Sequence, residues 1–292
     1  MERRPLGATG LSVSAVGLGA GRIGGPEKPE ADVDRLIGRA LDLGVTLIDS
    51  ARSYGLSEER LGRALRGRRE RVVLSTKVGY GIAGIPDWTG PCIAAGVDEA
   101  LQRLRTDRIE IVHLHSCPRE VLEGSGVVEA LVRAVEAGKV RVAAYSGEGD
   151  ALLWALRSGV FGAVQCSVSL VDQGALDAVS EARSKGIGVL AKRPLGNAPW
   201  HFESRPAEPD VAEAWDRFRA LRLERAALSW PALFARFAAF VPGVSAILPG
   251  TANPAHLADV ALAVEEGPIE ETQLTSLRAS FAREGARWLG RV

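Results

Sequence analysis

The sequence predicts an α/β fold, a (β/α)8 TIM barrel in which eight parallel strands alternate with helices. Short apolar runs rich in β-branched residues alternate with longer segments whose apolar residues recur at helical spacing. Eight such alternations within 292 residues fit one closed parallel barrel. The 33 glycines and 15 prolines suit the many turns of such a fold. We therefore expect a single domain over residues 1–292.

The predicted strands are short apolar runs bounded by turn residues. They are Ser14–Gly19, Val45–Ile48, Arg71–Thr76, Ile109–His115, Val140–Tyr145, Ala163–Gln165, Gly188–Ala191 and Ser245–Leu248. The alternative arrangement is an open doubly wound sheet. It fits less well because the glycine-rich segment 17–25 is followed by Pro26, so no helix begins where a dinucleotide-binding turn needs one.

The predicted helices lie between these runs, and the first of them collects its apolar residues on one face. They are Ala31–Leu43, Ser57–Leu65, Pro91–Leu104, Val127–Ala137, Asp150–Ser158, Ala175–Lys185 and Ala226–Phe240, with a last helix at Glu271–Glu284. Pro231 should kink the helix that contains it or lie in its first turn. Gly44, Gly138 and Gly186 each close a helix and are expected in the left-handed conformation.

Two segments are expected to lie outside this alternation. Leu6–Val13 precedes the first strand and has glycines at its turns, which predicts a β-hairpin that caps the floor of the barrel. Leu195–Pro209 is the longest irregular segment and is expected to form a loop over the barrel mouth.

The composition argues against several classes of protein. Lys plus Arg and Asp plus Glu are both 36, so the net charge is zero and nothing points to a nucleic-acid partner. No apolar run reaches the roughly 18 residues that span a bilayer, and the N-terminus lacks the apolar core of a signal peptide. Cys92, Cys117 and Cys166 lack metal-site spacing. We expect a cytoplasmic protein without metal or membrane, and we interpret Cys117 as a small loop residue rather than a reactive thiol.

Four residues near the predicted strand ends form a candidate catalytic site. Asp49, Lys77 and His115 lie at the ends of the second, third and fourth strands, and Tyr54 lies in the loop after the second. Because active sites of such barrels lie at the carboxyl ends of the strands, these side chains should meet at one rim. His113 points to the same face but lies deeper, so we interpret it as a core residue.

The four residue types suit the protonation of an oxyanion. A tyrosine can donate its proton if a neighbouring ammonium stabilises the phenolate that remains. Lys77 supplies that charge, Asp49 holds Lys77, and His115 can orient a carbonyl oxygen by a hydrogen bond. An Asp49–Lys77 pair taken alone is about as compatible with a structural role, but the four residues together favour catalysis.

The chain resembles the aldo-keto reductase family in these residues and in later segments. Asp49-Ser50-Ala51, Tyr54-Gly55 and Ser57-Glu58-Glu59-Arg60-Leu61-Gly62 are similar to the family's motif, and 6–14 is similar to its N-terminal hairpin. Residues 138–141 and 243–250 match later landmarks. The resemblance implies reduction of an aldehyde or ketone by a nicotinamide cofactor, with Tyr54 as proton donor, Lys77 and Asp49 tuning it, and His115 orienting the substrate.

The resemblance also implies residues that hold the cofactor. These are Gly21, Ser146, Gly147, Gln165, Lys192, Arg193, Pro194, Leu195, Gly250, Thr251, Asn253, His256 and Asp259. The family usually has Asn where this chain has Gly147, and an aromatic residue that stacks on the nicotinamide where it has Lys192. Either Lys192 contacts phosphate or Trp200 supplies the missing stack.

The adenosine end of the cofactor is expected at 250–259, where backbone amides and Thr251 at a helix N-terminus suit phosphate. The family's NADP-binding members usually have Lys or Arg here, whereas this chain offers Asn253 and His256. We expect NADPH from the habit of the family, with NADH as the alternative. Tyr80 and Trp88, which follow the third strand, are expected to line the substrate pocket.

Two other functions share the same fold. A nucleotide-binding regulatory subunit with little turnover is compatible with Gly147 and Lys192. A Schiff-base aldolase would use Lys77 as its amine, although a carboxylate partner keeps a lysine protonated. The oligomeric state, the substrate and the direction of the reaction stay open.

Overall fold

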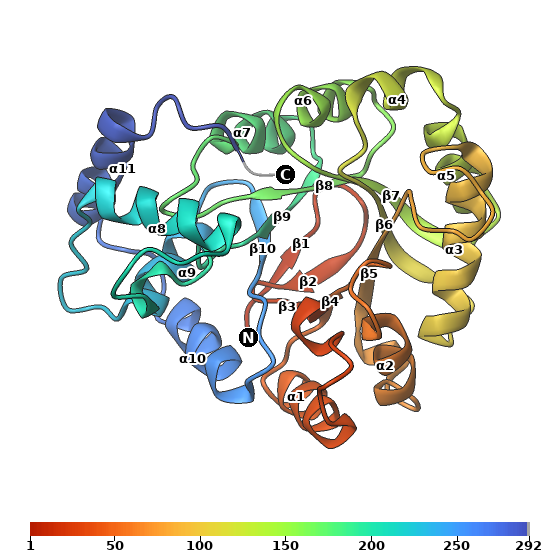
Figure 1. Ribbon diagram of the computed structural model, residues 1–292, viewed down its shortest axis with the longest axis horizontal. Helices are drawn as coiled ribbons and strands as arrows, with labels where there is room; N and C mark the ends of the chain where they lie inside the picture. Colours follow the sequence, from red (N-terminus) through yellow and green to blue (C-terminus); the bar gives the residue numbers. More distant parts are fainter. Residues whose placement is uncertain (291–292) are drawn as a thin grey trace.

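The computed structural model describes residues 1–290 and confirms the (β/α)8 barrel, with strands gathered at the centre and helices around them (Figure 1). The barrel strands pair in parallel in chain order. They are β3 (Leu18–Gly19), β4 (Leu47–Asp49), β5 (Val73–Val78), β6 (Ile109–His115), β7 (Val140–Ser146), β8 (Ala163–Ser167), β9 (Gly188–Lys192) and β10 (Val244–Leu248). Parallel bridges from Val16 to Ile247 and from Gly19 to Gly250 join the first strand to the last and close the ring.

The surrounding helices follow the predicted segments closely, with three additions. The helices are α1 (Glu30–Asp42), α2 (Ser57–Ala64), α3 (Gly90–Leu104), α4 (Arg119–Gly124), α5 (Val127–Glu136), α6 (Gly149–Arg157), α7 (Leu176–Ser184), α8 (Pro209–Leu221), α9 (Trp230–Ala239), α10 (Pro254–Glu265) and α11 (Glu271–Glu284). Short 3-10 turns occupy Ala20–Ile23, Arg69–Arg71 and Pro199–His201. The predicted series lacked α4, α8 and α10.

Two boundaries were predicted wrongly, and hydrogen bonding explains both. Of the segment 14–19, only Leu18–Gly19 forms a regular strand, because Ser14 belongs to the strand Ser12–Ser14, which pairs with Arg3–Pro5, and Val16 makes only an isolated bridge to Ile247. The helix predicted from Ala226 begins at Trp230, where the Ser229 hydroxyl accepts the backbone N–H of Ala232 and Pro231 occupies the first turn.

The predicted hairpin is present and plugs the amino-terminal end of the barrel. Strands β1 (Arg3–Pro5) and β2 (Ser12–Ser14) are antiparallel. Leu6, Leu11 and Val13 are buried in one cluster with the inward-facing residues of the barrel strands. The turn meets the start of β9, since the Ala8 N–H donates to the Gly186 oxygen at 2.7 Å. The floor is therefore sealed, and the opposite rim is left for a site.

Gly7 makes the docking of this hairpin possible. Its φ is +52°, and a Cβ built on it would lie 2.3 Å from the Gly186 oxygen and 2.4 Å from the Gly188 nitrogen. We expect Gly7→Ala to lower the free energy of unfolding, measured by urea denaturation, by about 3 kcal/mol or more. Gly10→Ala is the matched control, because Gly10 lies in the same turn at φ +73° with its nearest neighbour 3.6 Å away. It should cost only about 1 kcal/mol, and equal losses in the two variants would contradict the steric argument.

Candidate active site

A cavity of about 640 Å³ opens at the carboxyl ends of the barrel strands. The predicted site residues that line it are Gly21, Asp49, Tyr54, Lys77, His115, Ser146, Gln165, Lys192, Arg193, Pro194, Leu195 and Gly250. Strand register brings residues far apart in the sequence into one row, because His115 pairs with Ser146 and Ser146 pairs with Gln165. The barrel thus assembles this row at one rim.

A buried ion pair lies at the base of the cavity. Lys77 Nζ lies 2.6 Å from Asp49 Oδ2 and donates to the Ser50 carbonyl at 2.7 Å. The other carboxylate oxygen of Asp49 accepts from Ser75 Oγ at 2.7 Å and from Gln165 Nε2 at 3.1 Å. Both side chains of the pair are almost fully buried. Each charge therefore depends on the hydrogen bonds that replace its water.

The pair stays ionised despite its burial. Burial opposes both charges, but at Asp49 the attraction of Lys77, together with His113 and the hydrogen bonds from Lys77 and Ser75, outweighs burial and holds the pKa of that carboxyl below its usual value. At Lys77 burial is the largest single effect, but the attraction of Asp49 and Tyr54 and the hydrogen bonds to them together outweigh it and raise the pKa of the ammonium. A lysine held protonated in this way is a poor nucleophile, which argues against a Schiff-base role for Lys77.

Tyr54 and His115 stand over this ion pair. The Tyr54 ring centroid lies 5.0 Å from Lys77 Nζ and 6.2 Å from the His115 ring, to which it is nearly perpendicular. The ring also lies against Gly21, where a Cβ would be 3.5 Å away. Burial and the charges of Lys77 and Lys192 lower the pKa of His115 to about 3, so its imidazole is neutral at pH 7.

A polar layer lies beneath the ion pair. Ser75 Oγ, which donates to Asp49, is 3.0 Å from Nε2 of the fully buried His113. His113 was interpreted as a core residue, and the structure places it in the core with a hydrogen bond to the residue that holds Asp49.

The surface expected to hold the nicotinamide carboxamide is built around Ser146 and Gln165. Ser146 Oγ donates to Gln165 Oε1 at 3.1 Å. Gly147 does not line the cavity, and a Cβ on it would lie 2.3 Å from the hydroxyl of Tyr145. That hydroxyl donates to the Cys117 carbonyl at 3.1 Å, which fixes the ring in place. The Tyr145 ring is therefore the physical reason that this chain has glycine at 147.

Lys192 lines the cavity in a buried pair with Glu148, a residue that the sequence reasoning missed. Lys192 Nζ lies 3.3 Å from Glu148 Oε1, which also accepts the Ser167 N–H at 2.7 Å. Burial raises the pKa of Glu148 to about 7, against the attraction of Lys192, and burial lowers the pKa of Lys192. Trp200 packs on Phe234, with ring centroids 4.9 Å apart, and does not line this cavity.

A second cavity of about 640 Å³ adjoins the first and shares Gly21, Arg22 and Gly250 with it. It holds four of the residues predicted for the adenosine end, namely Gly250, Thr251, Asn253 and His256. Asn253 caps α10, because its side chain accepts the Ala255 N–H at 2.9 Å. Asp259 lies on the exposed surface of α10, outside the lining of either cavity.

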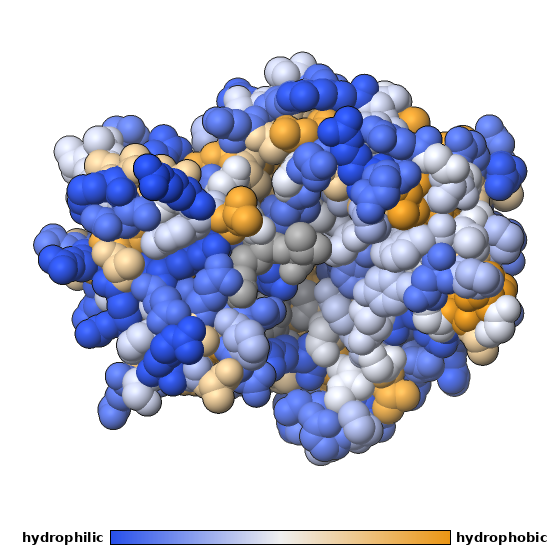
Figure 2. Space-filling model, turned by 45° about the horizontal axis from the view of Figure 1, so that its top comes forward, coloured by the Kyte–Doolittle hydropathy of each residue, from blue (hydrophilic) through white to orange (hydrophobic). Residues whose placement is uncertain are grey.

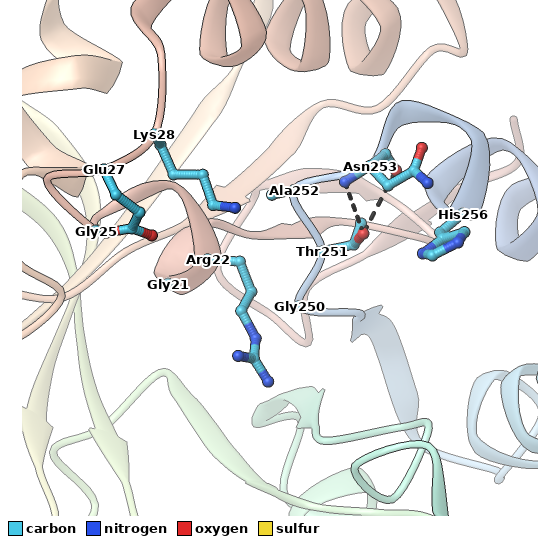
Figure 3. Close-up of a pocket in the computed structure, with 10 residues that line it drawn as sticks. All are labelled: Gly21, Arg22, Gly25, Glu27, Lys28, Gly250, Thr251, Ala252, Asn253 and His256. Carbon is cyan, nitrogen blue, oxygen red and sulfur yellow. Dashed lines mark hydrogen bonds between the residues drawn. The ribbon is translucent and has the colours of Figure 1, made fainter. Parts of the chain in front are cut away.

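Residues of the segment before α1 form the opposite wall of this second cavity. Figure 3 shows the Lys28 side chain extended toward the 250–253 loop, the Arg22 side chain pointing away from Lys28, and the Glu27 carboxylate turned toward Gly25. The sequence reasoning missed these three side chains. The position of Arg22 directly after the first barrel strand could have indicated a role at the rim. That it lies opposite Thr251 follows only from the pairing at the end of that strand, between Gly19 and Gly250, which the sequence does not show.

The residues predicted for the substrate wall lie beside the main cavity. Tyr80 does not line it but hydrogen-bonds to His115, with Tyr80 Oη 2.7 Å from Nδ1. Trp88 packs on Gly79, where a Cβ would overlap its ring. Cys117 is fully buried, and burial raises the pKa of its thiol to about 12, which is the behaviour of an unreactive cysteine.

Within residues 1–290, no cluster of three His, Cys, Asp or Glu side chains is arranged to hold a metal ion. No helix in the described part of the chain is long and apolar enough to cross a membrane. On the face shown in Figure 2, hydrophobic residues form small separate patches among hydrophilic ones.

Comparison with known proteins supports an oxidoreductase role. A model of the aldo/keto reductase family matches residues 15–281. The chain is 32% identical over 237 residues to L-galactose dehydrogenase of Arabidopsis thaliana, with 73% of each chain covered. It is 33% identical over 160 residues to an aldo-keto reductase of Bacillus subtilis, covering 48% of this chain and 45% of that relative. The chain belongs to the aldo/keto reductase family.

Solved structures agree with this assignment. A structure from Pseudomonas aeruginosa that carries the aldo-keto reductase name is 32% identical, with a TM-score of 0.73 over 90% of this chain and 95% of that one. The holo form of an aldo-keto reductase from Bacillus halodurans has the same fold, with a TM-score of 0.83 over 96% of each chain at 24% identity.

The polar layer under the site predicts a pH dependence of stability. Burial, opposed by the charge of Asp49, holds the pKa of His113 at about 4, below the 6.5 of an unfolded chain. The unfolded state therefore takes up a proton at a pH where the folded state does not, and stability present above pH 6.5 is lost as the pH falls toward 4. At pH 5 this loss is about 2 kcal/mol.

We expect His113→Gln to reduce the difference in unfolding free energy between pH 8 and pH 5 by about that amount, measured by urea denaturation. His201→Gln, at an exposed position, is the control variant. An unchanged difference in His113→Gln would show that His113 titrates normally in the folded protein.

Proposed function

We propose that this chain is an NAD(P)H-dependent oxidoreductase that reduces an aldehyde or ketone to an alcohol, with Tyr54 as the proton donor. One observation carries the proposal: the Tyr54 ring lies beside the buried, charged Lys77 and opposite the neutral His115 on the wall of one cavity. A dihydronicotinamide bound in that cavity would supply the hydride that reaches the carbonyl carbon.

The residues of the chain would manage the negative charge that develops on the carbonyl oxygen. Tyr54 donates its proton to that oxygen, and the ammonium of Lys77 stabilises the phenolate that remains. Asp49 keeps Lys77 charged and fixed in place. His115, being neutral, donates one hydrogen bond to the same oxygen without competing as an acid.

The lining of the two cavities fits a dinucleotide cofactor. Ser146 and Gln165 offer polar groups for a carboxamide in the main cavity, and the N-terminus of α10 with Thr251 suits phosphate in the second. The polar character of the lining also suits a small hydroxylated substrate, and one relative is an L-galactose dehydrogenase.

The three cysteines are free thiols, which accords with the cytoplasmic location expected from the sequence.

We further propose that the cofactor is NADPH and that Lys28 provides the cation for its 2′-phosphate. Lys28 reaches toward the 250–253 loop across the second cavity, and Arg22 lies on the shared border of the two cavities. Within residues 1–290, neither side chain is held in an ion pair. Their charge takes the place of the Lys or Arg that NADP-binding relatives carry after the last strand.

The alternative is a nucleotide-binding subunit of the same fold with little turnover. It is favoured by Gly147 and by the Glu148–Lys192 pair, which replace two residues that relatives use against the nicotinamide. Such a protein would bind the cofactor tightly without consuming it in the presence of carbonyl compounds.

The rate of carbonyl reduction by the wild-type protein and by Tyr54→Phe distinguishes the reductase from the nucleotide-binding subunit. We expect the wild-type protein to oxidise NADPH in the presence of activated aldehydes or of sugars such as L-galactose, tested in both directions by absorbance. The phenylalanine variant, which keeps the ring but has no proton to donate, should lose at least about a hundredfold in kcat. Its affinity for NADP+ should stay within about twofold, since only the hydroxyl is lost.

Ser53→Ala, one residue before Tyr54, is the control for local disturbance of the loop. Wild-type turnover in Tyr54→Phe would remove Tyr54 from its role. Tight cofactor binding by a wild-type protein that turns over none of the compounds in either direction would favour the regulatory subunit.

Binding of cofactor fragments tests the role of Lys28. We expect Lys28→Met to weaken the binding of NADP+ and of 2′,5′-ADP by about tenfold or more, because a charge-assisted contact to phosphate is lost. The affinity for NAD+ and 5′-AMP should hardly change. Calorimetry, or the fluorescence of the six tryptophans, measures both without any turnover.

Lys139→Met is the matched control, since Lys139 directly precedes β7 at the floor of the barrel and pairs with Asp98. It should leave both affinities unchanged. Tighter binding of NAD+ than of NADP+ by the wild-type protein would contradict the assignment of NADPH.

A further inference from the structure

Tyr80 lies against the His115 ring and does not line the main cavity. The two rings are stacked, with centroids 5.5 Å apart and planes 24° apart. Tyr80 Oη lies 2.7 Å from His115 Nδ1. Because Nδ1 is engaged by Tyr80, Nε2 is the ring nitrogen of His115 that is left for a molecule in the main cavity, which His115 lines.

The position of Tyr80 is itself fixed from its other face. Trp88 packs edge-to-face on the Tyr80 ring with centroids 5.6 Å apart. The backbone N–H of Trp88 donates to the Gly79 carbonyl at 2.8 Å. Gly79, at φ +145°, has no side chain that would displace the Trp88 ring. The Tyr80 ring is thus packed against both Trp88 and His115.

The direction of the Tyr80–His115 hydrogen bond decides what His115 can do. A neutral imidazole has one N–H donor and one bare acceptor nitrogen, and only the nitrogen that carries hydrogen can donate to a carbonyl oxygen. If Nδ1 accepts from Tyr80, the hydrogen is on Nε2. If Nδ1 donates to Tyr80, Nε2 is bare and repels a carbonyl oxygen.

Two observations favour Tyr80 as the donor. A separation of 2.7 Å is the usual distance for an O–H donor and lies at the short end of the range for an N–H donor. An imidazole nitrogen is also a stronger base than a phenol oxygen, and a phenol O–H is a stronger acid than a neutral imidazole N–H. Within residues 1–290, the other hydrogen-bond partner of the Tyr80 hydroxyl is Ser53 Oγ, which lies 3.3 Å away, beyond the usual range for an O–H donor.

We propose that Tyr80 is a positioning residue that fixes His115 in the tautomer with hydrogen on Nε2, so that His115 presents a donor to the carbonyl oxygen. The inference rests on the proposed reduction of a carbonyl, but the tautomer is a property of the protein before any substrate is bound. It assigns Tyr80 a role through His115 rather than as part of the substrate wall.

Nitrogen NMR of the histidine rings reads this tautomer directly. The chain has four histidines, so a two-bond proton–nitrogen spectrum of histidine-labelled protein contains four ring patterns, and the pattern lost in His115→Gln identifies His115. We expect the wild-type protein, saturated with NADP+, to show a hydrogen-bearing Nε2 and a bare Nδ1. Tyr80→Phe keeps the stacked ring but has no hydroxyl, so its His115 pattern should shift toward a mixture of tautomers.

Kinetics supply the second readout. Tyr80→Phe should lower kcat/KM for the carbonyl by about fivefold to tenfold, the worth of one neutral hydrogen bond, with NADP+ affinity unchanged. Ser53→Ala is the matched control, because it removes the weaker partner of the same hydroxyl. It should leave both the tautomer and kcat/KM as in the wild-type protein.

The outcomes separate this inference from the proposed function. A hydrogen-bearing Nδ1 in the wild-type protein, or an unchanged His115 pattern in a folded Tyr80→Phe, would overturn the role of Tyr80 whatever the turnover. A wild-type protein with the expected pattern that reduces no carbonyl would instead refute the proposed reaction and leave the Tyr80–His115 assignment standing.

Discussion

Closure of the barrel between its first and last strands is the constraint on which the rest of the structure depends. In the segment 16–19, Val16 pairs with Ile247 of β10 and Gly19 pairs with Gly250 just after it, although about 230 residues separate the two segments in the sequence. That pairing sets Arg22 and Lys28 across from the 250–253 loop and joins the two cavities through their shared residues. Because a closed ring of parallel strands has all its carboxyl ends at one rim, every group proposed for binding or catalysis meets there.

The buried Asp49–Lys77 pair shows how the barrel interior supports charge at that rim. Removing two charges from water is costly unless each finds hydrogen-bonding partners. Here the partners come from three different strands or loops and are the Ser50 carbonyl, Ser75 and Gln165. Ser75 in turn contacts His113, so a polar layer separates the ion pair from the apolar floor formed with the hairpin. The environment of Tyr54 therefore depends on residues two layers below it.

Departures from the usual cofactor surface have local causes. Gly147 leaves room for the Tyr145 ring, and Lys192 is neutralised by Glu148 within the same wall. Each change depends on a neighbouring side chain. An asparagine at 147 would overlap Tyr145, and Lys192 is paired with Glu148. The two changes alter the surface around the nicotinamide site and leave the Asp49–Lys77 pair intact. The two parts of the site can thus vary separately.

The sequence by itself determined the alternation of strands and helices, and with it the barrel, because strand and helix periodicities and their turn residues are local signals. It also placed Asp49, Lys77 and His115 at strand ends, since each follows an apolar run. It did not determine what surrounds them. The Glu148–Lys192 pair, the Tyr80–His115 hydrogen bond and the approach of Lys28 to the 250–253 loop join residues distant in sequence, and short periodic patterns carry no information about such contacts. Strand register and barrel closure decided them, because only the folded ring fixes which strand ends face one another.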